Sequence, residues 1–217
     1  MDLNESDTMS RPKQPGEARK TVLDAAIAVI RAKGYADTTV DDICRTGGVT
    51  KGTFFHYFKS KEDMALAAAD QWGALVNAEF ANAPYQRQTD PAERVLGYID
   101  YRKSLLTGDP ADFTCLLGTM VQEAFDTHPR IRAACERHLR EPAAILALEI
   151  EAALKQRGIV AEWSPESLAL YTQAVLQGAF ILAKASQSPQ VAIESVDHLR
   201  RYLAFVFGST GQPGPAS

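Results

Sequence analysis

Apolar residues recur at helical spacing along most of the chain. Between residues 18 and 33, Val22, Leu23, Ala26, Ile27 and Ile30 follow intervals of three and four, which predicts a helix that ends at Gly34. The same spacing, with its caps and breaks, predicts helices over residues 40–46, 51–57, 60–81, 91–107, 112–125, 129–157, 164–185 and 188–207. No segment shows sustained strand alternation. We therefore expect an all-α fold of about nine helices.

Local side-chain chemistry fixes several of these boundaries. Thr39 with Asp42, and Ser60 with Asp63, have the spacing of capping boxes, and Thr50 has the character of an N-cap. Proline lacks an N–H and clashes with the preceding turn, so Pro142 predicts a kink or break inside residues 129–157.

Composition places the chain among ordinary soluble proteins. Its 217 residues are 46% hydrophobic and 23% charged. Three cysteines, Cys44, Cys115 and Cys135, are too few and too scattered for a disulfide framework. No uncharged apolar stretch reaches about 18 residues and the N-terminus has no apolar core, so we expect no membrane span and no secretory signal. The expected location is the cytoplasm.

Charge divides the chain unevenly. The net charge of −4 combines −3 in residues 1–10, +3 in residues 11–63 and −4 in residues 64–217. A basic segment beside an acidic remainder is compatible with nucleic-acid binding at one end. We expect a disordered N-terminal arm (1–16), a helix-turn-helix DNA-binding domain (17–63), a ligand-binding and dimerisation domain (64–208) and a disordered tail (209–217).

The functional motif lies in the basic segment. Gly47, Gly48 and Val49 join two short helices by a sharp turn, as in a helix-turn-helix. The second helix would lie in the DNA major groove, and lysines around it would neutralise phosphates. The predicted DNA-binding residues combine helix caps, this helix and the lysines after it: Thr39, Thr50, Lys51, Gly52, Thr53, Phe55, His56, Tyr57, Lys59 and Lys61.

Residues 38–62, TTVDDICRTGGVTKGTFFHYFKSKE, resemble the DNA-binding signature of the TetR/AcrR family of transcriptional regulators, and Gly34 and Tyr35 before them match as well. The resemblance implies a homodimer on palindromic operator DNA, usually a repressor that a small molecule releases. Phe55 stands where the family usually has a tyrosine that touches the DNA backbone, and Tyr57 could donate instead. Cys44 and Gly47 replace the usual alanines with other small residues.

The larger part of the chain is expected to bind a small-molecule effector between its helices. Candidate ligand-binding residues are Trp72, Tyr98, Tyr101, Phe113 and Met120, although such residues in a bundle are mostly ordinary core. The last two long helices would form a four-helix dimer interface, because Ala174, Gly178, Ala179, Ala183 and Ala185 permit close approach. The same small residues also permit packing within one chain.

Cys115 and Lys184 form a candidate redox sensor. Cys115 lies at the start of a predicted helix, where a thiolate is favoured. Its segment and that of Lys184 are similar to those of a TetR-family branch that senses electrophiles and oxidants by oxidation or alkylation of the cysteine. The alternative is a structural, buried thiol. Cys135 and His138 supply half a metal site at most, so no metal or other cofactor is expected.

Two other classes of protein stay as alternatives. An all-α enzyme would need a titratable cluster, and the sequence contains no nucleotide-binding, zinc-protease or serine-hydrolase motif. A helical protein-interaction module would leave the basic residues around the recognition helix without a partner. We therefore expect a DNA-binding regulator and no enzyme.

Overall fold

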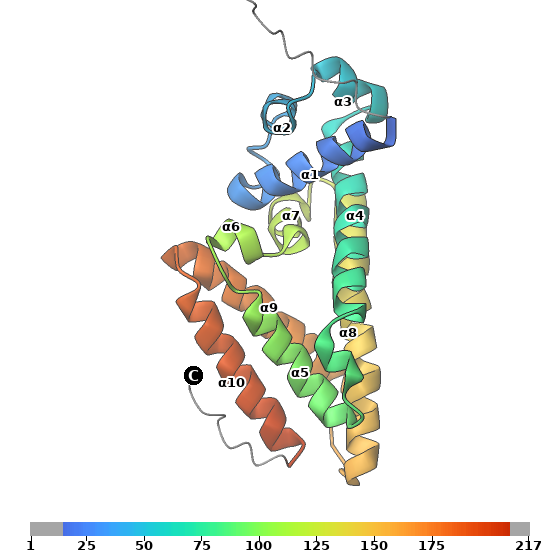
Figure 1. Ribbon diagram of the computed structural model, residues 1–217, viewed down its shortest axis with the longest axis vertical. Coiled ribbons are helices and arrows are strands. Elements are labelled where there is room, and N and C mark those ends of the chain that lie inside the picture. The colour runs from blue at the N-terminus through green and yellow to red at the C-terminus, as the bar shows by residue number, and fades with distance from the viewer. Residues whose placement is uncertain (1–14, 209–217) are drawn as a thin grey trace, which may run out of the picture.

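A computed structural model describes residues 15–208, and this part of the chain is helical without strands (Figure 1). Nine of its ten α-helices have seven residues or more, which confirms the predicted all-α fold. The predicted arm before residue 15 and the tail after residue 208 lie outside the described residues. The helices are α1 (Pro15–Lys33), α2 (Val40–Gly47), α3 (Lys51–Tyr57), α4 (Lys61–Ala81), α5 (Pro91–Ser104), α6 (Pro110–Phe113), α7 (Leu116–Ala124), α8 (Pro129–Arg157), α9 (Pro165–Ser186) and α10 (Gln190–Val206), with a short 3-10 helix, η1 (Pro84–Arg87), before α5.

The predicted N-caps form at Thr39, Thr50 and Ser60, but only one of the two predicted capping boxes is reciprocal. Thr39 and Asp42 make a reciprocal capping box at α2, and the Thr50 hydroxyl accepts from the Thr53 N–H at α3. Ser60 caps α4, but the Asp63 carboxylate accepts from the N–H of Lys59 rather than from that of Ser60. Gly48 follows α2 in the left-handed conformation (φ 61°), which glycine adopts without strain.

Four predicted boundaries are wrong, one of them the end of α5, which lies at Ser104 rather than at residue 107. The helix α1 begins at Pro15, within the predicted arm, and α10 begins at Gln190 after a cap at Pro189. The predicted helix over residues 112–125 is two helices, because Thr114 and Cys115 are extended. The Arg31 Nε donates to the Thr114 carbonyl at that break (2.8 Å). Pro142 lies inside α8 without ending it.

The buried side chains form two cores. The first core joins α1, α2, α3 and the start of α4 to α7 and the start of α8, as far as Cys135. The second core joins α5 and the rest of α8 to α9 and α10. Figure 1 shows α1–α3 at one end of the elongated molecule and α9 and α10 away from it. The division into residues 17–63 and 64–208 stays a prediction, since the first core includes residues on both sides of it.

One face of α9 and α10 is apolar and exposed. Tyr171, Ile181 and Leu182 on α9, and Tyr202 and Phe205 on α10, point outward, and Phe205 is 83% exposed. Ala179 and Ala183 are buried instead, so these two predicted interface residues pack within the chain. Among the described helices, α9 alone is long and apolar enough to cross a membrane, a weak test that core helices of soluble proteins also pass.

Candidate DNA-binding surface and ligand cavities

The short helix α3 has one buried face and one exposed face. Phe54 and Phe58 are buried in the first core, which anchors the helix. Lys51, Gly52 and His56 are exposed, and so is Phe55, at 54%. An exposed aromatic residue between two buried ones, on a helix of seven residues, leaves a mixed polar and aromatic surface that a partner can contact.

The N-terminus of α3 is well organised. The Thr50 hydroxyl accepts from the Thr53 N–H (3.1 Å) and lies 3.0 Å from the Thr53 hydroxyl. Lys51 pairs with Asp41 of α2 at 2.8 Å, and both side chains are largely exposed. A pair of this kind contributes little stability, so Lys51 can exchange its partner for a phosphate. The His56 and Tyr57 rings are in edge contact, 4.7 Å between centroids.

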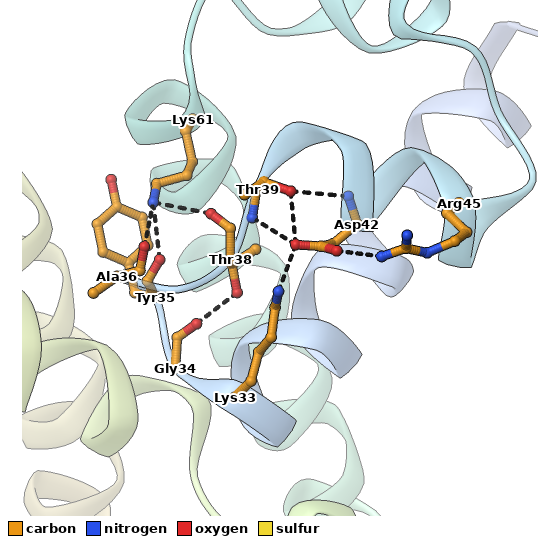
Figure 2. Close-up of polar contacts among 9 residues, drawn as sticks. All are labelled: Lys33, Gly34, Tyr35, Ala36, Thr38, Thr39, Asp42, Arg45 and Lys61. Atoms are coloured by element: carbon orange, nitrogen blue, oxygen red, sulfur yellow. Dashed lines mark hydrogen bonds and ion pairs between the residues drawn. The ribbon is translucent and has the colours of Figure 1, made fainter.

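Lys61, predicted as a phosphate contact, bonds to the turn between α1 and α2. Its ammonium donates to the carbonyls of Tyr35 (2.9 Å), Ala36 (3.2 Å) and Thr38 (3.0 Å), and it lies over the Tyr35 ring (Figure 2). These bonds use all three donors of the ammonium. Burial lowers the pKa of Lys61. The sequence places a lysine just after the recognition helix, but it does not show that this lysine bonds to the turn between α1 and α2.

A second polar network fixes the start of α2. The Asp42 carboxylate accepts from the Thr39 N–H and hydroxyl and pairs with Lys33 of α1 and with Arg45 (Figure 2). The hydrogen bond from Lys33 and those from Thr39 hold the pKa of Asp42 well below its usual range. The predicted DNA contact Thr39 therefore uses its hydroxyl and N–H to bind Asp42, and its side chain stays exposed.

Two adjoining cavities lie within the larger part of the molecule. The first, here the Trp72 cavity, measures about 50 Å³ and is lined by Trp72, Phe113, Cys115 and Gln173, among others. The second, the Tyr98 cavity, measures about 130 Å³ and is lined by Phe80, Tyr85 and Tyr98, among others. Both cavities share Val76, Asn77, Arg102 and Pro142 as lining residues.

Residues 22–68 match the family described as bacterial regulatory proteins, tetR family, and residues 91–199 match the tetracyclin repressor-like C-terminal domain. The chain belongs to the TetR family. It is therefore a DNA-binding transcriptional regulator. The first match covers α2 and α3, whose caps and exposed face are described above.

Individual relatives of this TetR-family regulator are distant but cover most of its length. The HTH-type transcriptional repressor NemR of Escherichia coli K12 is 21% identical, over 87% of this chain and 94% of its own. A TetR-family regulator from Agrobacterium tumefaciens has a TM-score of 0.78 at 20% identity, covering 87% of this chain and 98% of that one. The regulator CifR, solved as a cysteine mutant with 26-bp operator DNA, has a TM-score of 0.73 at 17% identity, covering 88% and 98%.

The predicted ligand residues of the regulator divide into two groups. Trp72 and Phe113 line the Trp72 cavity, and Tyr98 lines the Tyr98 cavity. Met120 is fully buried in the first core, and Tyr101 packs on Phe80 beside the Tyr98 cavity without lining it. Met120 is buried there because α7 belongs to the first core, which its sequence pattern did not indicate.

The structure adds lining residues that sequence reasoning missed. Arg102 is the most informative, because its guanidinium covers the Phe80 ring (4.1 Å) and its Nε donates to the Tyr98 hydroxyl (3.0 Å). Arg102 follows Tyr98 by four residues on a predicted helix, and that spacing was the available signal. Gln173 is a second omission: it is 9% exposed, and its side-chain amide forms no hydrogen bond within the described part of the chain.

Cys115 lies where the two cores of the regulator meet. It is the N-cap residue of α7, is half-buried and packs against both cores. Arg31 and Lys184 lie within electrostatic range of its sulfur. The Lys184 ammonium donates to the Thr119 hydroxyl (2.8 Å), and that hydroxyl donates to the Cys115 carbonyl (3.1 Å). Burial lowers the pKa of Lys184.

Polar contacts join the larger part of the regulator to α1 and to the turn that follows it. Arg31 of α1 donates to Thr114 and lies over the ring of Trp72, which lines the Trp72 cavity. Glu123 of α7 accepts from the Ala36 N–H in the turn after α1 (2.7 Å). Through these contacts, α4 and α7, which contribute to the Trp72 cavity, touch α1 and the turn that leads to α2.

Cys135 and His138 do not share a ligand site. Cys135 is buried in the first core, and burial raises the pKa of its thiol to about 12. The His138 Nε2 lies 2.9 Å from the Asp70 carboxylate. Within residues 15–208, no three His, Cys, Asp or Glu side chains are grouped as a metal site would require.

Proposed function

We propose that this regulator is a homodimeric repressor that binds a palindromic operator through α3 and leaves the DNA when a small molecule occupies its cavities. The observation that carries the proposal is the exposed face of α3, where Lys51, Phe55 and His56 surround a capped helix N-terminus. The proposal assigns the chain to the cytoplasm and gives it no enzymatic activity.

The proposed DNA contacts come from the exposed side of α3 and its flanks. Gly52 lets the α3 backbone approach a phosphate, since a Cβ added there would meet nothing nearer than the Thr50 hydroxyl oxygen at 3.5 Å. Lys51 and Lys59 would neutralise phosphates, and Thr53, His56 and Tyr57 would contact bases or backbone. Lys61 is left out, because its donors are already used.

The proposed dimer interface is the exposed apolar face of α9 and α10. Tyr171, Ala174, Gly178, Ile181 and Ala185 recur at intervals of three and four along α9, none of them within the buried core. Tyr202 of α10 continues this surface through its ring contact with Tyr171 (5.6 Å). Such a stripe, facing its own copy across a twofold axis, would give a four-helix interface.

Electrophiles are a second candidate class of effector, and Cys115 would react with them. Its half-buried thiol lines the Trp72 cavity and has two cationic neighbours, an environment typical of reactive cysteines. The thiol would lose its proton to water, and its sulfur would form a C–S bond with an electrophilic carbon as the bond from that carbon to its leaving group breaks, which is the C–I bond in iodoacetamide. Iodoacetamide should label Cys115 and spare buried Cys44 and Cys135, as read by peptide mass spectrometry. Equal labelling of all three thiols in the folded protein would contradict this assignment.

Selection of bound fragments from random duplex DNA tests the proposed function. The purified dimer, at near-physiological salt, should enrich an inverted repeat whose half-sites lie about one helical turn apart or somewhat more. The association constant for the selected DNA should fall by about 0.9 logarithmic units for each tenfold rise in salt concentration and each phosphate contact. A folded dimer that enriches no sequence would overturn the proposal.

A further inference from the structure

Arg102 stands between the two cavities with an uncompensated charge. Its Nε is satisfied by the Tyr98 hydroxyl, and its flat face is covered by Phe80. Within residues 15–208, no carboxylate pairs with it and no acceptor is bonded to its two terminal nitrogens. Four N–H donors of a rigid, planar group are thus available at the junction of the cavities.

The other two charged side chains that line the Tyr98 cavity pair with each other. Arg94 and Glu149 both line the Tyr98 cavity and pair with each other at 2.7 Å. Tyr85 also lines it, and burial raises the pKa of its hydroxyl to about 12, so it adds no negative charge near neutral pH. With Arg102, the lining of the Tyr98 cavity therefore carries one net positive charge, which matches a monoanion.

The residues that line the Tyr98 cavity indicate the chemistry of the rest of the ligand. Phe80, Tyr85, Tyr98, Ile145 and Leu146 present aromatic and aliphatic surfaces next to Arg102. A cavity of about 150 Å³ binds benzene, and the Tyr98 cavity measures about 130 Å³. The space next to the guanidinium suits a single ring or a short branched chain rather than a long lipid.

We infer that the effector is a small carboxylic acid with one apolar ring or short chain, whose carboxylate pairs with Arg102 while its body fills the Tyr98 cavity. A guanidinium binds a carboxylate through two parallel hydrogen bonds, which fixes the orientation of the acid. The inference rests on the proposed function, because it names the class of effector for the cavities assigned there.

Calorimetric titration of the full-length protein with matched acids and amides tests this inference. Phenylacetate and benzoate are the probes, and phenylacetamide and benzamide share their shapes without the charge. At least one acid should bind about ten to a hundred times more tightly than its amide, as expected for charge-assisted hydrogen bonds in a cavity. Equal binding of acid and amide, or no binding of either acid at millimolar concentration, would overturn the inference.

Two substitutions in α5 test whether the positive charge that binds the acid is that of Arg102. Arg102→Gln should weaken acid binding about ten- to a hundredfold and leave amide binding unchanged. Lys103→Gln is the matched control: it also removes one positive charge from α5, but Lys103 pairs with Asp197 and lines neither cavity. Equal losses in the two variants would contradict a contact at Arg102. If Arg102→Gln does not fold, the comparison of acids with amides on the wild-type protein still tests the inference.

These titrations contain no DNA, so they separate the inference from the proposed function. If the DNA selection enriches no sequence, the proposed repressor function is overturned, whether or not the acids bind. Failure of the acids, with an operator selected, would overturn only the effector class.

Discussion

The polar groups at the turn from α1 to α2 are paired with one another, whereas two polar side chains at the cavities are not. Around the turn from α1 to α2, Lys61 donates to three carbonyls and Asp42 receives Lys33, Thr39 and Arg45 (Figure 2). Around the cavities, Arg102 and Gln173 keep polar groups without partners in the described chain. This contrast agrees with the proposal that the cavities, rather than the turn between α1 and α2, bind the small molecule.

The largest expected effect separates the two faces of α3. Phe54→Ala should lower the free energy of unfolding by about 3–5 kcal/mol, because it empties a fully buried site in the first core. Phe55→Ala, one residue along and 54% exposed, should change it by less than about 1 kcal/mol and weaken DNA binding instead. Urea unfolding at fixed protein concentration checks both. Equal destabilisation would show that the exposed face is misassigned.

The next effect concerns the lysine that closes the turn. Lys61→Ala should cost about 2 kcal/mol of unfolding free energy, since three carbonyls lose a charged donor. Lys59→Ala is the matched control, because that side chain is exposed, and it should stay within about 0.5 kcal/mol. The same denaturation measurement compares them. An unchanged unfolding free energy in Lys61→Ala would contradict a stabilising role for the three hydrogen bonds and would favour Lys61 as a DNA contact.

Gly52→Ala should move stability and DNA binding in opposite directions. Gly52 lies inside α3 with an ordinary φ and room for a Cβ, so alanine should stabilise the folded protein by about 0.5–1 kcal/mol. The added methyl would hold the backbone away from a phosphate and weaken operator binding. Thermal unfolding and fluorescence anisotropy measure the two quantities. Unchanged DNA affinity would remove Gly52 from the contact surface.

The smallest effect is a pH dependence at the start of α2. Hydrogen bonds lower the pKa of folded Asp42, so its stabilising contribution is complete above its unfolded pKa of about 4. That contribution is lost as the pH falls from there through the lower folded pKa. Asp42→Asn should reduce stability near pH 7 and flatten the acid limb of the stability curve. An acid limb identical to that of the wild type would contradict the assignment.

The sequence predicted the features that depend on near neighbours. Thr39 with Asp42 and Thr50 with Thr53 are three residues apart, so caps and turn could be located from spacing alone. The cavities could not, because Trp72, Arg102 and Gln173 come from three helices that meet only in the fold. The break before α7 contains neither glycine nor proline, and its Thr114 carbonyl binds Arg31 from far away in the chain. The contacts of Lys61 with the turn after α1 could not be predicted for the same reason.

The most direct test of the account is the affinity of the double variant Lys51→Ala, His56→Ala for the selected operator. Both side chains lie on the exposed face of α3, so the variant should remain a folded dimer by light scattering and circular dichroism. Its affinity should fall by about a hundredfold, as expected for the loss of one phosphate contact and one base contact. Unchanged affinity in a folded dimer would contradict the assignment of α3 as the DNA-reading helix.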